Sequence, residues 1–144
     1  MKRLLLAVSI GTVLFCAAAL PAAAHHSFAA EFDANKPITL HGTITKLEWI
    51  NPHSWLHIDV KNGDGTTSEW MVEAATPNTL LRRGFTRDTV KAGTEITVVG
   101  YQAKSGAHRA NGRDLILADG SHLFMGSSES GAPGDPAKAQ PAPQ

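Results

Sequence analysis

The chain has 144 residues, with 13 basic and 13 acidic side chains, seven histidines and one cysteine, and its formal net charge is zero when histidine is neutral. Nucleic-acid affinity rests largely on neutralising phosphates, so a balanced chain without a Lys/Arg stripe argues against a nucleic-acid partner. The length suits one domain of ordinary size.

Residues 1–24 have the order of a secretory signal peptide. A positive head at 1–3 precedes an apolar run at 4–20, and small residues follow at 21–24. The run is interrupted by Ala, Gly and Ser, which argues against a membrane span. We therefore predict cleavage after Ala24, a periplasmic or secreted location, and no membrane span in the mature chain.

The single cysteine, Cys16, lies inside this segment and follows the large residue Phe15. A lipid-anchor site calls for a small residue there, so a lipoprotein is disfavoured. Lys2 and Arg3 leave with the segment, so 11 basic and 13 acidic residues remain, a net charge of −2. Without cysteine, the mature chain has no disulfide and no thiolate metal site.

Residues 25–37 are predicted to form an N-terminal, histidine-containing arm. Phe28 and Phe32 are four residues apart, which suits one face of a short helix or two anchors of an ordered coil. We expect both rings to dock the arm onto the domain. A strand with period-two alternation follows at 38–49, and its phase slips after Ile44. Together with Gly42, this slip predicts a bulged and strongly bent strand.

Further strands are predicted at 55–60, 68–74, 95–101, 113–118 and 121–125. A short helix is predicted at 76–84, with Pro77 in its first turn and Gly84 after its end. This order predicts a mainly β domain at 38–125, a small OB-like Greek-key barrel with one helix between strands 3 and 4. A small β-sandwich is the alternative. Residues 126–144 are rich in Pro, Ala, Gly and Ser and are predicted to be a disordered tail.

Four stretches of the chain resemble a known family. They read HHSFA at 25–29, EWINPH at 48–53, WMVE at 70–73 and GTEITVVG at 93–100. On these stretches the chain resembles the exported bacterial proteins grouped as DUF6152, over about residues 25 to 125. The resemblance implies export and supports a single folded domain, and it brings no established activity.

The histidines of the arm are the main chemical feature. Imidazole is a common ligand of copper and zinc. Cleavage after Ala24 would give His25 a free α-amine that chelates Cu(II) with a ring nitrogen. Cleavage one residue earlier would place His26 third, where the amine, two amides and its ring can form a square plane. We therefore predict a candidate copper site at His25, His26 and His53, with a polar arm that binds no metal as the alternative.

Outward positions of the second and third strands form a second cluster: His53, Trp55, His57 and Asp59 opposite Glu69, Met71 and Glu73. One register sets His57 opposite Glu69 and His53 opposite Glu73. A shift by two sets Asp59 opposite Glu69 and Trp55 opposite Glu73. His57, Asp59, Glu69 and Glu73 are therefore predicted either to support a metal site or to form surface pairs.

Trp49 and Trp70 occupy inward positions and are expected in the core, which leaves Trp55 as the candidate contact residue for a ligand. No nucleophile elbow or phosphate loop is present, so we predict that the protein is not an enzyme. The function predicted is a non-enzymatic binding protein of the periplasm, with Cu(II) as candidate ligand and copper as the only candidate cofactor. The alternative is a module of the cell envelope that binds an unknown protein or oligosaccharide.

Overall fold

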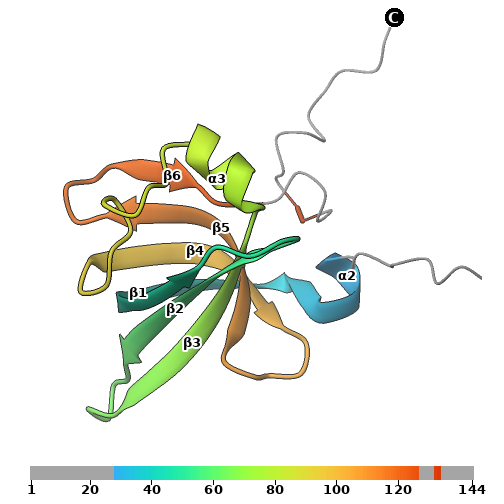
Figure 1. Ribbon diagram of the computed structural model, residues 1–144. Coiled ribbons are helices and arrows are strands. Elements are labelled where there is room, and N and C mark those ends of the chain that lie inside the picture. Colours follow the sequence, from blue (N-terminus) through green and yellow to red (C-terminus); the bar gives the residue numbers. More distant parts are fainter. Residues whose placement is uncertain (1–27, 127–131, 134–144) are drawn as a thin grey trace, which may run out of the picture.

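The computed structural model describes residues 28–126 and 132–133, and most of this part is one six-stranded sheet that closes on itself (Figure 1). The predictions for the signal peptide, for His25 and His26, and for most of the tail lie outside the described residues. The strands are β1 Phe32–Glu48, β2 Ser54–Lys61, β3 Thr67–Ala74, β4 Glu95–Ala103, β5 Arg109–Leu117 and β6 His122–Phe124.

The strand order confirms the predicted OB-like barrel. Neighbours in the sheet run β3-β2-β1-β4-β5-β6, and a further parallel pairing of β3 with β5 closes the ring. The other pairings are antiparallel. A helix, α3 Pro77–Arg82, lies between β3 and β4, as predicted. A ring closed by β3 and β5 is a barrel and not two separate packed sheets, so the sandwich alternative is excluded.

The first strand is longer than predicted and is bent where the phase slip indicated. Its pairing with β2 shifts between Ile44 and Lys46, which confirms a bulge. A Cβ atom on Gly42 would lie 2.6 Å from the carbonyl oxygen of Asp59, so glycine permits the close approach of β1 and β2. The strand begins at Phe32, which pairs with Ala103 of β4. Residues 32–37, predicted as part of the arm, therefore belong to the sheet.

The short helix α3 has the predicted signals at both ends. The hydroxyl of Thr76 accepts a hydrogen bond from the amide of Thr79 at 3.3 Å, and Pro77 occupies the first turn. Gly84 follows the helix with a φ of 88°, a conformation that favours glycine. Leu80 is fully buried, so the helix covers one end of the barrel core.

The barrel interior is filled by the inward positions of every long strand and by two residues of the α3 region. Trp70 is 8% exposed and Trp49 packs against the core, which confirms their predicted inward positions. The largest fully enclosed core side chains are Ile44, Leu56, Ile58, Val72, Leu80, Phe85, Val98, Leu115 and Met125.

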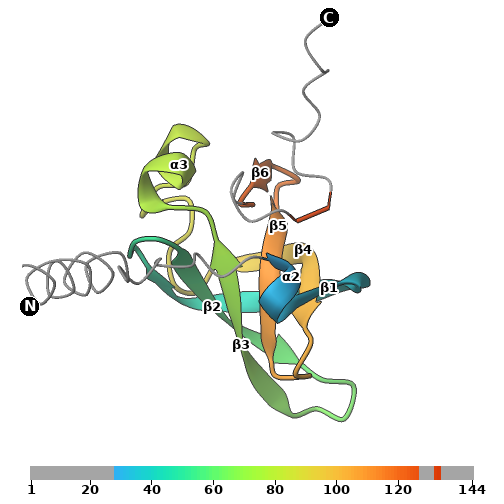
Figure 2. The same ribbon diagram turned by 90° about the vertical axis from the view of Figure 1, so that its right-hand side faces the viewer.

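The N-terminal segment docks on the outside of the barrel, as predicted. The one-turn helix α2 Phe28–Glu31 lies over β4 and β5 (Figure 2). The ring of Phe28 meets Tyr101 edge-on at 5.3 Å between centroids and Phe32 at 5.8 Å. Ala132 is buried in the same cluster, and the hydroxyl of Tyr101 donates to the carbonyl of Pro133 at 3.2 Å. Two segments far apart in sequence thus meet at Tyr101.

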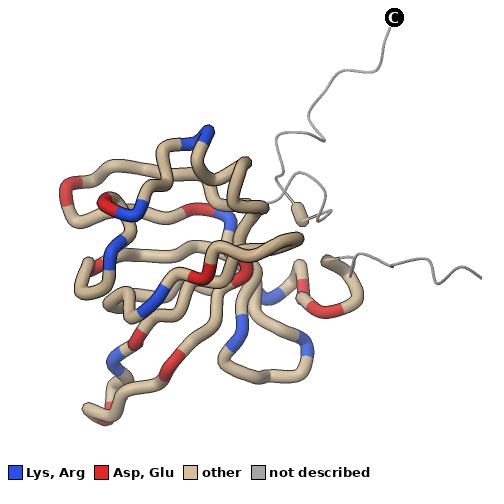
Figure 3. The backbone as a smooth tube through the Cα atoms, viewed as in Figure 1, with Lys and Arg blue, Asp and Glu red and all other residues tan. Residues whose placement is uncertain are grey.

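In the described part of the chain, no helix is long and apolar enough to cross a membrane. Lys and Arg alternate with Asp and Glu over the strands and loops shown in Figure 3, without a continuous basic stripe. The surface therefore agrees with the charge balance read from the sequence.

Candidate functional site

The outward face of β2 and β3 carries the predicted polar cluster. Alternation along both strands buries Leu56, Ile58, Trp70 and Val72, so the intervening side chains point away from the core. In the observed register Trp55 lies opposite Glu73 and Asp59 lies opposite Glu69. This is the second of the two registers considered.

Both histidine–carboxylate pairs nevertheless form, because the side chains meet diagonally. His57 Nδ1 lies 3.0 Å from Glu69 Oε1, and His53 Nδ1 lies 3.3 Å from Glu73 Oε1. Diagonal neighbours on an antiparallel pair are within reach of long side chains. The backbone register is therefore that of the second alternative, whereas the histidine–carboxylate contacts are those that the first alternative predicted.

The outer pair, His57 with Glu69, is hydrogen-bonded, and its carboxylate is near solvent. The His57 side chain is 13% exposed, and its Nε2 has no hydrogen-bond partner among the described residues. The Glu69 side chain is 64% exposed. His57 Nε2 also lies 3.4 Å from Glu48 Oε1 on β1. Glu48 contacts the Lys46 ammonium, and hydrogen bonding to that ammonium holds the pKa of Glu48 below its usual value. The sequence did not predict Glu48 as part of this cluster. It follows the phase slip in the first strand, so the alternation does not show on which face of the sheet it lies.

In the inner pair, His53 with Glu73, the carboxylate is the buried member. The side chain of Glu73 is 9% exposed, and that of His53 is 17% exposed. The pKa of Glu73 is raised from 4.5 to about 7, chiefly by burial and also by the negative charge of Glu31, while the cation of Arg109 opposes both. Although His53 Nδ1 is close to Glu73, the contact lacks hydrogen-bond geometry, and this nitrogen has no hydrogen-bond partner among the described residues. The pair therefore combines a buried carboxyl, which Arg109 compensates only in part, with an unsatisfied imidazole nitrogen.

The arm contributes to the surroundings of Glu73. Glu31 Oε1 of α2 lies 2.6 Å from Arg109 Nη1 on β5. The guanidinium of Arg109 lies 4.7 Å above the centre of the Trp55 ring, in a cation–π contact. Trp55, the candidate contact residue, is therefore partly covered by a side chain of the protein. Sequence reasoning missed Glu31 and Arg109 because only the closed barrel and the docked arm bring them together.

A third buried polar residue adjoins Glu73. Asn111 of β5 is paired with Glu73 across the parallel β3–β5 pairing and with Tyr101 across β4. It is 2% exposed, and its Oδ1 has no hydrogen-bond partner in the part of the chain that the structure describes. Unsatisfied buried oxygen atoms are uncommon in folded proteins and call for an explanation. No sequence signal marks this residue, since it lies in the first half of β5, before the predicted strand.

Of the three predicted metal ligands, only His53 lies within the described residues. Among residues 28–126 and 132–133, no three side chains of His, Cys, Asp or Glu converge closely enough to hold a metal ion. His41 Nδ1 lies 2.9 Å from Thr97 Oγ1, His108 stacks on Trp70, and His122 Nε2 lies 3.7 Å from Asp114. These three histidines therefore have separate surroundings, as expected for scattered surface histidines.

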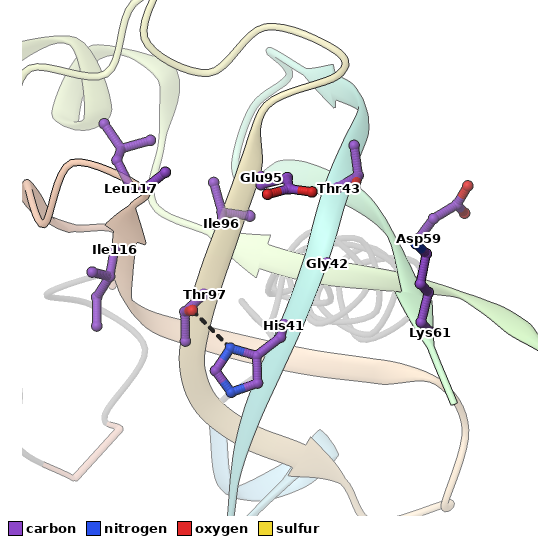
Figure 4. Close-up of a pocket in the computed structure, with 11 residues that line it drawn as sticks. His41, Gly42, Thr43, Asp59, Lys61, Glu95, Ile96, Thr97, Ile116 and Leu117 are labelled. Atoms are coloured by element: carbon purple, nitrogen blue, oxygen red, sulfur yellow. Dashed lines mark hydrogen bonds between the residues drawn. The ribbon is translucent and has the colours of Figure 1, made fainter. Parts of the chain in front are cut away.

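A hollow of about 420 Å³ lies elsewhere on the barrel, across β2, β1, β4 and β5 (Figure 4). His41 and Thr97 meet at one side of it, Ile116 and Leu117 line the β5 end, and Asp59 stands at the β2 end. Asp59 is the only predicted site residue in its lining. The hollow is therefore distinct from the buried pair at His53.

Comparison with known proteins places the chain in one family. A family model described as "Family of unknown function (DUF6152)" matches residues 13–112, which confirms the resemblance noted in the sequence. No curated protein matches the chain.

Proposed function

The chain belongs to the DUF6152 family, which carries no assigned activity, and we propose that it is an exported, non-enzymatic binding protein for Cu(II) or a similar divalent metal ion. The ligands proposed are His25 and His26 of the arm together with His53 of the barrel. The observation that carries the proposal is the half-buried His53 beside Glu73, whose buried Nδ1 has no hydrogen-bond partner among the described residues.

The docked arm supports the choice of His25 and His26 as further ligands. No group of three His, Cys, Asp or Glu side chains converges within the described residues, so His53 needs donors from elsewhere or of another kind. Glu31 is close enough to Glu73 to influence its pKa. His26 precedes Phe28 by two residues, so chain length limits its Cα to about 7 Å from that anchored residue.

The proposed copper site requires a free α-amine at the mature N-terminus. A free α-amine with a His25 ring nitrogen, or an amine and two amides with His26, gives the tetragonal nitrogen set that Cu(II) prefers. Both arrangements are lost when the α-amine is blocked, or when three residues without histidine are added before the mature N-terminus, because neither His25 nor His26 then stands within the first three positions. The alternative module that uses Trp55 is less well supported, since Arg109 lies over that ring.

Mass spectrometry of the exported protein, with and without one equivalent of Cu(II), tests the proposal. We expect a mature chain that begins at Ala24 or His25 and carries one copper ion. An extension by three residues without histidine should lower copper affinity strongly, whereas an extension of the same length at the C-terminus, as a control, should not. A mature chain that binds no copper would refute the proposal.

A further inference from the structure

We propose that Glu73 and Asn111 are metal ligands together with His53, and that these three side chains of the barrel wall hold a tetrahedral divalent ion such as Zn²⁺. The inference deepens the proposed function and rests on it in part, because His53 is common to both. It differs in assigning two oxygen ligands that do not depend on the free N-terminus.

The spacing of His53 and Glu73 is the first argument. Their facing atoms, Nδ1 and Oε1, are 3.3 Å apart without hydrogen-bond geometry. Two ligands of a tetrahedral ion with bonds of about 2.0–2.1 Å are separated by about 3.3 Å. The pair therefore has the separation of neighbouring ligands of one ion, and no hydrogen bond between them has to be broken for the ion to bind.

The unsatisfied Asn111 oxygen is the second argument. Asn111 lies beside Glu73 on the adjacent strand, while its neighbour Ala110 pairs with the inward residue Val72. Strand alternation therefore places Asn111 and Glu73 on the same face. The Asn111 Oδ1 is buried and has no partner within residues 28–126 and 132–133. An amide oxygen is a metal ligand of the same hard class as a carboxylate, so the ion would satisfy both.

The local charge is the third argument. Glu31 and Arg109 pair with each other at 2.6 Å, so the Arg109 cation only partly compensates the Glu73 carboxylate when it is ionised. A buried charge without compensation is costly, and a bound cation would compensate it. One imidazole nitrogen and two oxygens form a ligand set of intermediate hardness. Such a set suits zinc and other divalent ions of the first transition row.

The outer pair offers a matched control on the same two strands. His57 and Glu69 repeat the diagonal geometry of His53 and Glu73. Their contact is hydrogen-bonded at 3.0 Å, and Glu69 is largely exposed. Removal of the Glu69 charge should therefore leave metal binding unchanged.

The experiment measures Zn²⁺ and Cu²⁺ affinity of the full exported protein by competition with a chromophoric chelator. The variants are Glu73→Gln and Asn111→Leu, with Glu69→Gln as the control. We expect each wall variant to lose at least about tenfold in Zn²⁺ affinity. The Cu²⁺ electron paramagnetic resonance spectrum of Glu73→Gln should also change, which a merely structural role would not produce.

A further variant covers the case in which Asn111→Leu does not fold. Asn111→Asp keeps the shape and adds a ligand charge, so it should bind Zn²⁺ more tightly than the parent protein. Circular dichroism verifies the fold of each variant before affinity is measured.

The outcomes separate the two proposals. Wall variants that bind Zn²⁺ as tightly as the parent, while His25→Ala or His26→Ala abolishes copper binding, would overturn this inference and leave the proposed function standing. Loss of binding in the wall variants, with no effect of the arm variants, would support the inference and refute the N-terminal site. A parent protein that binds neither ion would overturn both.

Discussion

The buried carboxyl of Glu73 predicts an unusual dependence of stability on pH, which Glu73→Gln should remove. The pKa of Glu73 in the folded protein is about 7, against an ordinary value of 4.5. Below pH 4.5 the carboxyl is protonated in the folded and unfolded states alike. Between pH 4.5 and 7 the unfolded chain releases the proton and the folded protein retains it. The contribution of Glu73 to folding stability therefore falls as the pH rises through this window.

The size of the effect follows from the width of the window. At 1.36 kcal/mol per pH unit, the interval from 4.5 to about 7 corresponds to roughly 3 kcal/mol. The side chain keeps some contact with solvent, so we expect about 2 to 3 kcal/mol. Glutamine has nearly the same shape and cannot ionise. Relative to the parent protein, Glu73→Gln should gain this amount between pH 4 and pH 8.

Urea denaturation followed by tryptophan fluorescence, at several pH values and with a chelator present, measures this difference. The other titratable groups are present in both proteins, so the difference between them isolates Glu73. Glu69→Gln, at an exposed position of the same strand, should show a much smaller change. A difference between Glu73→Gln and the parent that stays constant from pH 4 to pH 8 would refute the reasoning.

Three further predictions concern the fold. Gly42→Ala should destabilise the protein by about 1 to 3 kcal/mol in urea, because its Cβ would lie 2.6 Å from a backbone oxygen; Gly63→Ala, where a Cβ meets nothing within 4 Å, should cost little, and equal effects would contradict the close approach of β1 and β2 at Gly42. Phe28→Ala removes the ring at the centre of the arm contact, and up to about 3 kcal/mol should be lost; hydrogen exchange over residues 28–35 should rise, and unchanged protection there would argue against docking by this ring. Thr76→Ala should cost about 0.5 to 2 kcal/mol through the lost helix cap, whereas Thr76→Ser should retain most of the stability, and identical melting temperatures for both variants would exclude the capping role.

Much of the fold could be predicted from local patterns. The period-two alternation identified the inward side chains, and the phase slip after Ile44 located the bulge. Proline and glycine at the ends of 76–84 located the helix. The start of β1 was placed too late, because Phe32 joins the sheet through Ala103, a contact between distant residues. Pairing between distant residues leaves no local pattern at the end of a strand.

The candidate site was predicted in part. His53, His57, Glu69 and Glu73 were identified as facing one another, and both diagonal contacts form. The difference in burial between Glu73 and Glu69 could not be predicted, because it depends on which segments of the folded chain cover each carboxylate. Glu48 approaches the outer pair from β1, and the inner pair adjoins a strand and an arm that are remote in sequence.

The sequence by itself therefore determined which side chains point outward, where the strands break and where a helix is inserted, because each depends on neighbours a few residues apart. Only the tertiary structure decided that β5 closes the barrel beside β3 and that α2 docks over it. Closure places Asn111 beside Glu73, and docking brings Glu31 to Arg109. Burial is a property of the assembled surface, and it distinguishes a carboxyl with a pKa of about 7 from an ordinary surface glutamate.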